Sequence, residues 1–272
     1  PPGAADYTTI GDALADAASF DTILLSPGTY TGDGNHTLDF DGRRLTIESS
    51  DGPEATLVDF EDNPGIRMEG VGSSGSAVSG ITFRGGRRFE EAAVSCDNVI
   101  AVAVSDCVFE HCGIGHVNGA AADLYECKDL SVTNCAFRDC RKGIRVRRCD
   151  GDIQGCEFVR NSAGNVYENG GAMECSGWGT QTLSVSDCEF TDNYCGDDGG
   201  AVEYWGNRVI FEDCTFTENQ TPGDGAGVHV NVSYGNNTPG YPAFLRCTFA
   251  DNHAGGRGGG ICTRYSNLIL RD

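Results

Sequence analysis

Three side chains suited to acid–base chemistry occur at one position of a repeated pattern. Glu174, Glu203 and His229 each follow a hydrophobic residue that comes after a glycine-rich step, and Cys262 takes this position in the next copy. Alternate residues of a strand point to opposite faces, so these four point outward if the hydrophobic residues point inward. Carboxylates one turn apart raise each other's pKa, which suits proton transfer on a sugar. Glu174, Glu203 and His229 are therefore the candidate catalytic strip.

The alternative is that this strip has no catalytic role, because carboxylates beside one histidine are ordinary on the surface of an acidic protein. Asp197, Asp198 and Asp224 come just before the same glycine-rich steps. Their carboxylates are candidate Ca²⁺ ligands, although aspartate is also a common turn residue. We expect no cofactor, with Ca²⁺ as the alternative.

The elements that must position these residues are set by a repeat of roughly 28 residues, a length typical of solenoids. Its core is Cys-x-Phe followed, in four copies, by two residues and Asn. A weaker copy is Ile81-Thr-Phe83. The columns expected from the repeat are Phe83, Phe109, Phe137, Phe158, Phe190, Phe216 and Phe249; Cys107, Cys135, Cys156, Cys188, Cys214 and Cys247; and Asn161, Asn193, Asn219 and Asn252.

Each repeat alternates apolar and polar residues, which indicates strands, and lies between loops rich in Gly, Asn and Asp. A strand-only unit of this length must stack on its neighbours to bury its apolar face. The sequence therefore predicts an all-β solenoid, a right-handed parallel β-helix with equivalent residues ~4.8 Å apart. A propeller is disfavoured because its blades need about 40–45 residues.

The first residues predict a short helix that caps the coil. Asp12 lies three residues after Thr9, as in a capping box, and an apolar face reaches Phe20. We expect one β-helix domain over residues 1–272, with residues 1–21 as the N-terminal cap and residues 22–272 as coils. Residues 266–272 match residues 205–213, which lead into Cys214, so we expect the coil to continue beyond residue 272.

Residues 7–17 and 21–30 resemble the opening of right-handed parallel β-helix proteins of the pectin-lyase-like class. Phe-x-x-Asn followed by Gly-Gly-Ala, as in 158–161 with 170–173 and 190–193 with 199–202, is similar to the repeats of polymorphic outer-membrane proteins. The resemblance implies a β-helix but leaves lyases, hydrolases, epimerases, adhesins and structural proteins open. The catalytic motifs of polygalacturonases and pectate lyases are not found.

The amino-acid composition limits the classes of partner that the chain can bind. The formal net charge of −21 over 272 residues disfavours nucleic acid, which needs a basic stripe. The one basic cluster either neutralises acidic neighbours or is a site for an acidic glycan or another partner; it consists of Arg141, Lys142, Arg145, Arg147 and Arg148. Aromatic residues near the strip, Trp178, Tyr204 and Trp205, are suited to stacking on a sugar. No apolar run approaches 18 residues, so no membrane span is expected.

Eight of the 14 cysteines fall into two groups. Those of the column are expected to stay reduced as small core residues. Cys112 and Cys140 stand where other turns carry Asn, on adjacent turns, and we expect a disulfide between them. Four Asn-x-Ser/Thr sequons predict glycosylated surface loops and, with the cysteines, an extracellular protein; they begin at Asn35, Asn219, Asn231 and Asn236.

Two functions follow. The first is an extracellular or cell-surface structural or adhesive β-helix, which is expected to contact copies of itself, other surface proteins or glycans by its sides or ends. Such contacts would make it a subunit or segment of a larger surface assembly or filament. The second is a lyase, hydrolase or epimerase that acts on an acidic glycan. The first is favoured because a recognisable catalytic set is not found.

Overall fold

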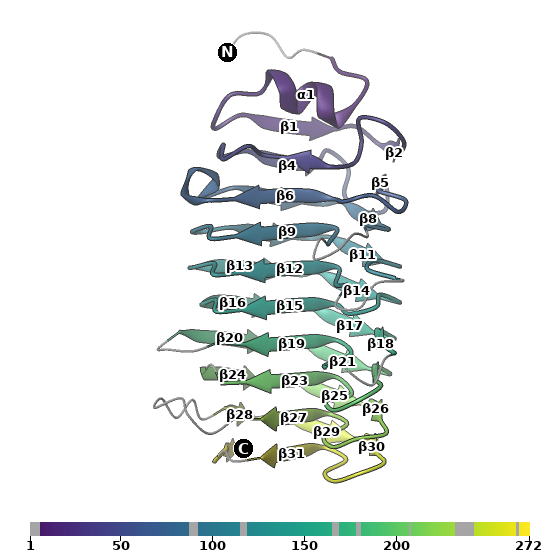
Figure 1. Ribbon diagram of the computed structural model, residues 1–272, viewed down its shortest axis with the longest axis vertical. Coiled ribbons are helices and arrows are strands. Elements are labelled where there is room, and N and C mark those ends of the chain that lie inside the picture. The colour runs from purple at the N-terminus through teal and green to yellow at the C-terminus, as the bar shows by residue number, and fades with distance from the viewer. Residues whose placement is uncertain are drawn as a thin grey trace.

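The computed structural model describes residues 6–86, 92–114, 119–164, 169–177, 181–206, 208–231, 242–264 and 267–272. Over these residues the chain winds into a parallel β-helix whose turns are stacked along one axis (Figure 1). Each turn contributes strands to three long sheets, and every pairing between consecutive turns is parallel. The predicted solenoid is therefore confirmed.

The described residues place ten strands in sheet A and nine in each of sheets B and C. Sheet A consists of β1 (Thr22–Leu25), β4 (Thr46–Ser49), β7 (Ala77–Ser79), β10 (Ala103–Ser105), β13 (Leu130–Thr133), β16 (Gly151–Gln154), β20 (Thr182–Ser186), β24 (Arg208–Glu212), β28 (Ala243–Leu245) and β32 (Ile269–Arg271). Sheet B consists of β2 (Gly28–Tyr30), β5 (Thr56–Asp59), β8 (Thr82–Arg84), β11 (Val108–Glu110), β14 (Ala136–Arg138), β17 (Glu157–Val159), β21 (Glu189–Thr191), β25 (Thr215–Thr217) and β29 (Thr248–Ala250).

Sheet C faces the viewer in Figure 1 and carries the candidate catalytic strip. It consists of β3 (Leu38–Asp39), β6 (Ile66–Glu69), β9 (Val94–Asp97), β12 (Ala122–Tyr125), β15 (Ile144–Arg147), β19 (Met173–Ser176), β23 (Val202–Trp205), β27 (Val228–Asn231) and β31 (Ile261–Arg264). A shorter sheet D joins the later turns between sheets B and C; it consists of β18 (Ser162–Ala163), β22 (Tyr194–Cys195), β26 (Gln220–Thr221) and β30 (His253–Ala254). One 3-10 turn, η1 (Val71–Ser73), follows β6.

Helix α1 (Ile10–Asp16) covers the first turn (Figure 1). The Thr9 side chain caps it by accepting a hydrogen bond from the Asp12 backbone N–H at 3.1 Å, as the capping box predicts. The predicted length is wrong, because the helix ends at Asp16 and Ala17 is already extended. Phe20 has a positive φ of 79° and is 75% exposed, so it does not belong to the apolar face of the cap. None of the helices in the described ranges is long and apolar enough to cross a membrane.

The phenylalanine column lies inside the coil in the predicted register. From Phe83 to Phe249 the centroids of successive rings are 4.7–5.3 Å apart. Phe60 extends the stack at 5.7 Å from Phe83, a rung that the repeat did not predict. All these rings are fully buried except that of Phe249.

The asparagine column is also confirmed, and it is completed by two cysteines. Each asparagine amide accepts a hydrogen bond from the backbone N–H of the previous turn, as Asn193 does from Asn161 at 3.0 Å. The pattern continues in the earlier turns. The backbone N–H of Cys140 donates to the Asn161 amide oxygen at 3.1 Å, and the backbone N–H of Cys112 donates to the Cys140 sulfur at 3.5 Å. The six members of this corner column are Cys112, Cys140, Asn161, Asn193, Asn219 and Asn252.

The predicted disulfide between Cys112 and Cys140 is wrong, because both are free and buried thiols. Each of the two thiols makes a hydrogen bond to the backbone. The Cys140 sulfur donates to the carbonyl of Phe109 and the Cys112 sulfur to that of Phe83, so each thiol bonds to the backbone of the turn before it. Cysteine therefore replaces the turn amide as a hydrogen-bonding group and not as a cross-link. The column from Cys107 to Cys247 is free as well, as expected.

A residue with a left-handed backbone conformation stands directly before each residue of the cysteine column, which runs from Cys107 to Cys247. Another stands directly before each residue of the corner column. Asp187 before Cys188 and Asp192 before Asn193 both have φ of 54°. This region is unfavourable for most side chains, but Asn, Asp and Gly adopt it most readily. It explains why Asp, Asn or Gly so often stands before Cys in the repeat: the chain must turn sharply there from sheet A into sheet B.

Candidate functional site

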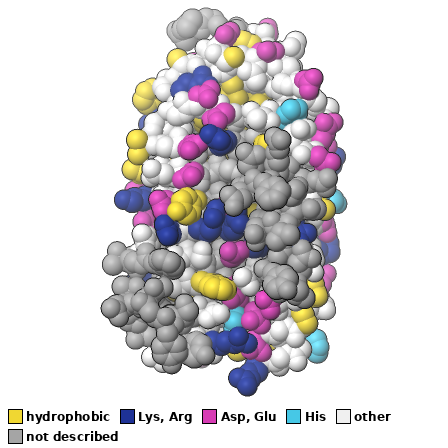
Figure 2. All heavy atoms as spheres, viewed as in Figure 1, with side chains coloured by type: hydrophobic (Ala, Val, Ile, Leu, Met, Phe, Trp, Pro, Cys, Tyr) yellow, Lys and Arg dark blue, Asp and Glu magenta, His cyan; other side chains and the backbone are white. Residues whose placement is uncertain are grey.

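The outward residues of sheet C form one column, as the sequence predicts. Glu174 pairs in register with Glu203, Glu203 with His229, and His229 with Cys262. We call the whole column the outer strip; from the first strand to the last it consists of Asp39, Arg67, Ser95, Asp123, Arg145, Glu174, Glu203, His229 and Cys262. Figure 2 shows this face, on which acidic and basic side chains are mixed and part of the surface is grey.

The middle of the outer strip is a buried ion-pair cluster. Arg145 donates to the Asp123 carboxylate, and both side chains are at most 7% exposed. Arg147, on the next outward position of β15, donates to Asp123 at 3.1 Å. Arg148 donates to Glu126 at 2.7 Å. Arg145, Arg147 and Arg148 of the basic cluster thus neutralise neighbouring carboxylates, which was one of the interpretations of its sequence.

Glu174 is the neighbour of Glu203 in register and has an ion-pair partner of its own. Its carboxylate accepts a hydrogen bond from Lys142, whose side chain is 1% exposed. A buried ammonium needs such a partner because an unpaired charge in this position is very costly. Glu174 is therefore engaged in an ion pair with Lys142, and a catalytic role for it beside Glu203 stays a prediction.

Glu203 and His229 form a buried carboxylate–imidazole pair. His229 Nδ1 lies 2.8 Å from Glu203 Oε2 and 3.6 Å from Asp198 Oδ2. Glu203 is 1% exposed and His229 is 0% exposed. Burial raises the pKa of Glu203 to about 7, although the imidazole opposes the shift. Burial is the largest single influence on the pKa of His229 and lowers it, but the hydrogen bond to Glu203 and the charges of Glu203 and Asp198 together outweigh burial, so the net shift is upward.

Turns with a left-handed glycine bring the aspartates against this pair. Gly199 has φ of 71°, and a Cβ there would lie 2.5 Å from the carbonyl oxygen of Val202, so glycine is required where the turn enters β23. This close approach places Asp198 beside His229. The corresponding turn before β27 carries Asp224 and has Gly225 at φ of 68°.

The aspartates of these turns are bound mainly to protein groups. Asp198 accepts a hydrogen bond from the Asp224 backbone N–H at 2.6 Å. Asp224 accepts one from the Arg257 backbone N–H and one from the Arg264 guanidinium, both at 2.6 Å. Arg264 lowers the pKa of Asp224, whereas burial, and then Asp198, raises that of Asp197. The Ca²⁺ site expected from Asp197, Asp198 and Asp224 stays a prediction.

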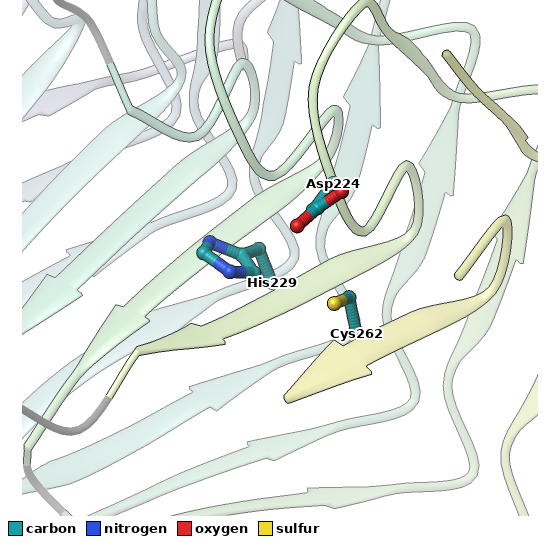
Figure 3. Close-up of side chains that lie close together, drawn as sticks. All are labelled: Asp224, His229 and Cys262. Atoms are coloured by element: carbon teal, nitrogen blue, oxygen red, sulfur yellow. The ribbon is translucent and has the colours of Figure 1, made fainter. Parts of the chain in front are cut away.

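The residues that the structure does bring together are Asp224, His229 and Cys262. One ligand atom of each lies within 4.8 Å of the others (Figure 3). The sequence analysis placed His229 and Cys262 in one column but did not connect them with Asp224. The signal that connects them is the constant distance from the turn aspartate to the outward position of the next strand, which is five residues from 198 to 203 and from 224 to 229.

The other predicted site residues have mixed outcomes. The sequons at Asn35 and Asn219 do not mark surface loops: Asn35 is 6% exposed and accepts from the Ile10 backbone N–H, and Asn219 belongs to the buried corner column. Asn231 is half-buried at the end of β27, and Asn236 lies outside the described residues. Trp205 is 38% exposed, but Tyr204 is buried and points inward; Trp178 is outside the described residues.

Comparison with known proteins decides the family. The family described as "Right handed beta helix region" matches residues 25–182 and 120–271. The chain belongs to this family. The match also confirms the predicted hand of the coil. The resemblance to polymorphic outer-membrane proteins stays a prediction, and a search of the curated proteins finds no match.

The right-handed β-helix of this chain is similar to several solved structures. An alginate lyase from Paenibacillus sp. str. FPU-7 is 14% identical, with a TM-score of 0.56, over 97% of this chain and 95% of that chain. Pectate lyase Pel9A is 12% identical, with a TM-score of 0.43, over 95% and 72%. The catalytic domain of a GH87 alpha-1,3-glucanase is 13% identical, with a TM-score of 0.44, over 100% and 70%. At these identities the likeness shows the fold alone.

Proposed function

We propose that this β-helix is a non-catalytic structural or adhesive protein of the extracellular space or cell surface. The observation that supports the proposal is the condition of the outer strip. Glu174 is paired with Lys142, and Glu203 and His229 are at most 1% exposed and paired with each other. A general acid or base must come within hydrogen-bonding distance of its substrate. Glu203 and His229 are buried away from solvent, and the Glu174 carboxylate is paired with Lys142.

The same pairing is what a rigid scaffold requires. Outward positions that are covered by turns must carry charges that compensate each other, because an unpaired buried charge is costly. Asp123 with Arg145, Glu174 with Lys142 and Glu203 with His229 satisfy this condition on successive turns. Contacts with partners are then expected on the exposed side and loop surfaces, with copies of the chain, other surface proteins or glycans.

A polysaccharide-active enzyme is the second candidate, and one observation favours it. Glu203 has a pKa near 7 and contacts an imidazole, which is the setting of a general acid–base group. The alginate lyase that shares the fold adds an analogy at the level of fold, which does not assign a reaction.

The test is an activity assay against a panel of uronate-containing and neutral polysaccharides. We expect no turnover above that of Glu203→Gln, which removes the titratable group but keeps its size. Turnover that is abolished in Glu203→Gln and retained in Glu189→Gln, a control on an exposed outward position of β21, would assign an enzyme instead.

The location and the adhesive role need separate measurements. Limited proteolysis of intact source cells, followed by immunodetection of the chain, should digest it if it is exposed at the surface. Protection of the chain until the cells are lysed would contradict the surface location. Binding of the purified chain to immobilised surface proteins and glycans of the source cells tests adhesion, and a failure to bind either would leave only the structural part of the proposal.

A further inference from the structure

We propose that Asp224, His229 and Cys262 form a binding site for a thiophilic divalent metal ion, with Zn²⁺ as the expected occupant. A carboxylate, an imidazole and a thiol are all ligands of Zn²⁺. Their ligand atoms already lie within 4.8 Å of one another. In a tetrahedral site with metal–ligand bonds of about 2.0–2.3 Å, ligand atoms are roughly 3.5 Å apart, so only a small contraction is needed.

The fold itself brings the three side chains together. His229 and Cys262 are neighbours in register on β27 and β31, so both project from the outer face of sheet C. Asp224 comes from the turn before β27, where a left-handed Gly225 folds the chain back over that face. Figure 3 shows the Asp224 carboxylate, the His229 ring and the Cys262 thiol close together. The site is thus built from two strands and a tight turn.

The two nitrogens of His229 provide the observation that points to a ligand. Nδ1 is engaged by Glu203 at 2.8 Å. Nε2 is fully buried and has no hydrogen-bond partner within the described part of the chain. A buried polar atom is nearly always satisfied, so an orphan of this kind calls for an explanation. A metal ion bound to Nε2 supplies the missing partner.

Glu203 then has the role of a supporting residue. A metal-bound histidine nearly always gives its other ring N–H to a carboxylate or a carbonyl, which fixes the tautomer and makes the ring a better ligand. Glu203 holds His229 in this manner, with Nδ1–H as the donor. The buried pair, which is not placed to act on a sugar, is explained as the second layer of a metal site.

Charge also favours a cation. Asp198 and Glu203 lie beside His229, and Asp224 lies close to both His229 and Cys262. Arg264 contacts Asp198 and Asp224. A carboxylate has about four lone-pair positions, so Asp224 can keep its two hydrogen bonds and still bind a metal. Nitrogen and sulfur ligands select Zn²⁺ or a related transition metal, whereas Ca²⁺ prefers oxygen alone.

The experiment is a metal titration of the full chain after chelator treatment and dialysis. We expect one Zn²⁺ per chain by calorimetry. With Co²⁺ as a probe, we expect the visible bands of a tetrahedral ion and a thiolate-to-cobalt charge-transfer band in the near ultraviolet. Cys262→Ser should abolish the charge-transfer band, and Glu203→Gln should weaken Zn²⁺ binding about 10–100-fold. Asp224→Asn and His229→Gln should weaken it further, because they remove ligands.

Matched controls keep the test decisive. Cys247→Ser changes a partly buried thiol outside the cluster and should leave binding and the cobalt spectrum unchanged. His253→Gln changes an exposed histidine of β30 and should also have no effect. Circular dichroism checks that each variant is folded. The cobalt spectrum of the unaltered chain tests thiolate ligation even if a variant fails to fold. Absence of Zn²⁺ binding, binding that survives Cys262→Ser undiminished, or binding of Ca²⁺ in preference to Zn²⁺ would overturn the proposal.

Discussion

Each buried asparagine of the corner column uses both ends of its amide. The Asn193 amide oxygen accepts from the backbone N–H of Asn161, and its nitrogen donates to the carbonyl of Phe158 and to Asn219. The column therefore satisfies backbone groups that the turn between sheets B and D leaves without strand partners. Cys140 accepts from one backbone N–H and donates to one carbonyl in the same manner, through a weaker acceptor and a weaker donor.

Asn193→Ala should therefore destabilise the protein by about 1–3 kcal/mol for each backbone group left unsatisfied. Asn193→Cys should cost less than Asn193→Ala, because the thiol can reproduce the bonds seen at Cys140. Urea unfolding of the two variants and the unaltered chain measures the difference. Equal losses in both variants would show that the column is held by packing and not by hydrogen bonds.

Stability should fall as pH rises through neutrality because of Glu203 and His229. Both have a pKa raised in the folded state, so the folded protein binds their protons more tightly than the unfolded chain does. The stabilisation is complete below the unfolded pKa of Glu, about 4.3, and is lost as pH rises through about 7. Roughly 1–3 kcal/mol should be lost between pH 5 and pH 8.

Urea unfolding at several pH values, with a chelator present, checks this dependence. Glu203→Gln should show a shallower decline between pH 5 and pH 8, because it removes one titrating group and the main cause of the His229 shift. A Glu203→Gln variant with the same decline as the unaltered chain would mean that the general repulsion of an acidic protein is responsible.

At the scale of elements, strands of only two to five residues are held by columns that run across them. The phenylalanine stack lies under sheet B, the cysteine column marks the entry to this sheet, and the corner column marks its exit. The sulfur atoms of the cysteine column donate to carbonyl groups, as Cys188 does to Ser186 at 3.1 Å. Free thiols thus complete the turns without a covalent bond.

All 14 cysteines should therefore be present as thiols in the purified chain. Alkylation under denaturing conditions without a reductant, followed by mass spectrometry, should label every one. In the native state Cys112 should react slowly, because burial and then the Cys140 thiol raise its pKa, and the thiolate is the reactive form. Recovery of a peptide with Cys112 joined to Cys140 would contradict the structure.

At the scale of the whole molecule, each turn contacts the turn before it and the turn after it. Stability in such a solenoid is a sum of local terms between neighbours, so damage is expected to stay local. The phenylalanine stack is continuous through most of the molecule, and Phe190 contacts Phe158 and Phe216 at 4.7 Å on its two sides.

Phe190→Ala should cost roughly 3–5 kcal/mol through the cavity that it leaves. Hydrogen exchange should accelerate mainly in the turns that contain β17, β21 and β25, while the turns near α1 keep their protection. Phe190→Leu, which leaves a smaller cavity, is the control and should show a weaker effect in the same turns. Uniform loss of protection over the whole chain would show that the solenoid unfolds as one cooperative unit.

The fold could be predicted from the sequence because its information is periodic and local. The Cys-x-Phe and Phe-x-x-Asn spacings determined the register of the columns, and alternation determined that Glu203, His229 and Cys262 share one face. Neighbours within a column follow from register alone, since equivalent residues of successive turns must lie side by side. The end of the capping helix does not follow from the sequence, because Ala17 and Phe20 fit the apolar face of a helix that in fact ends at Asp16.

The tertiary structure decided the direction, burial and partners of each side chain, which depend on how turns of different length fold back over the strip. In the structure the Cys112 and Cys140 thiols donate to backbone carbonyls, and Glu174 forms an ion pair with Lys142. Asn35 and Asn219 are buried. The tertiary structure also placed Asp224 over His229 and Cys262. The repeat length alone cannot predict these contacts, because they join a turn to a strand at a spatial separation that the repeat does not specify.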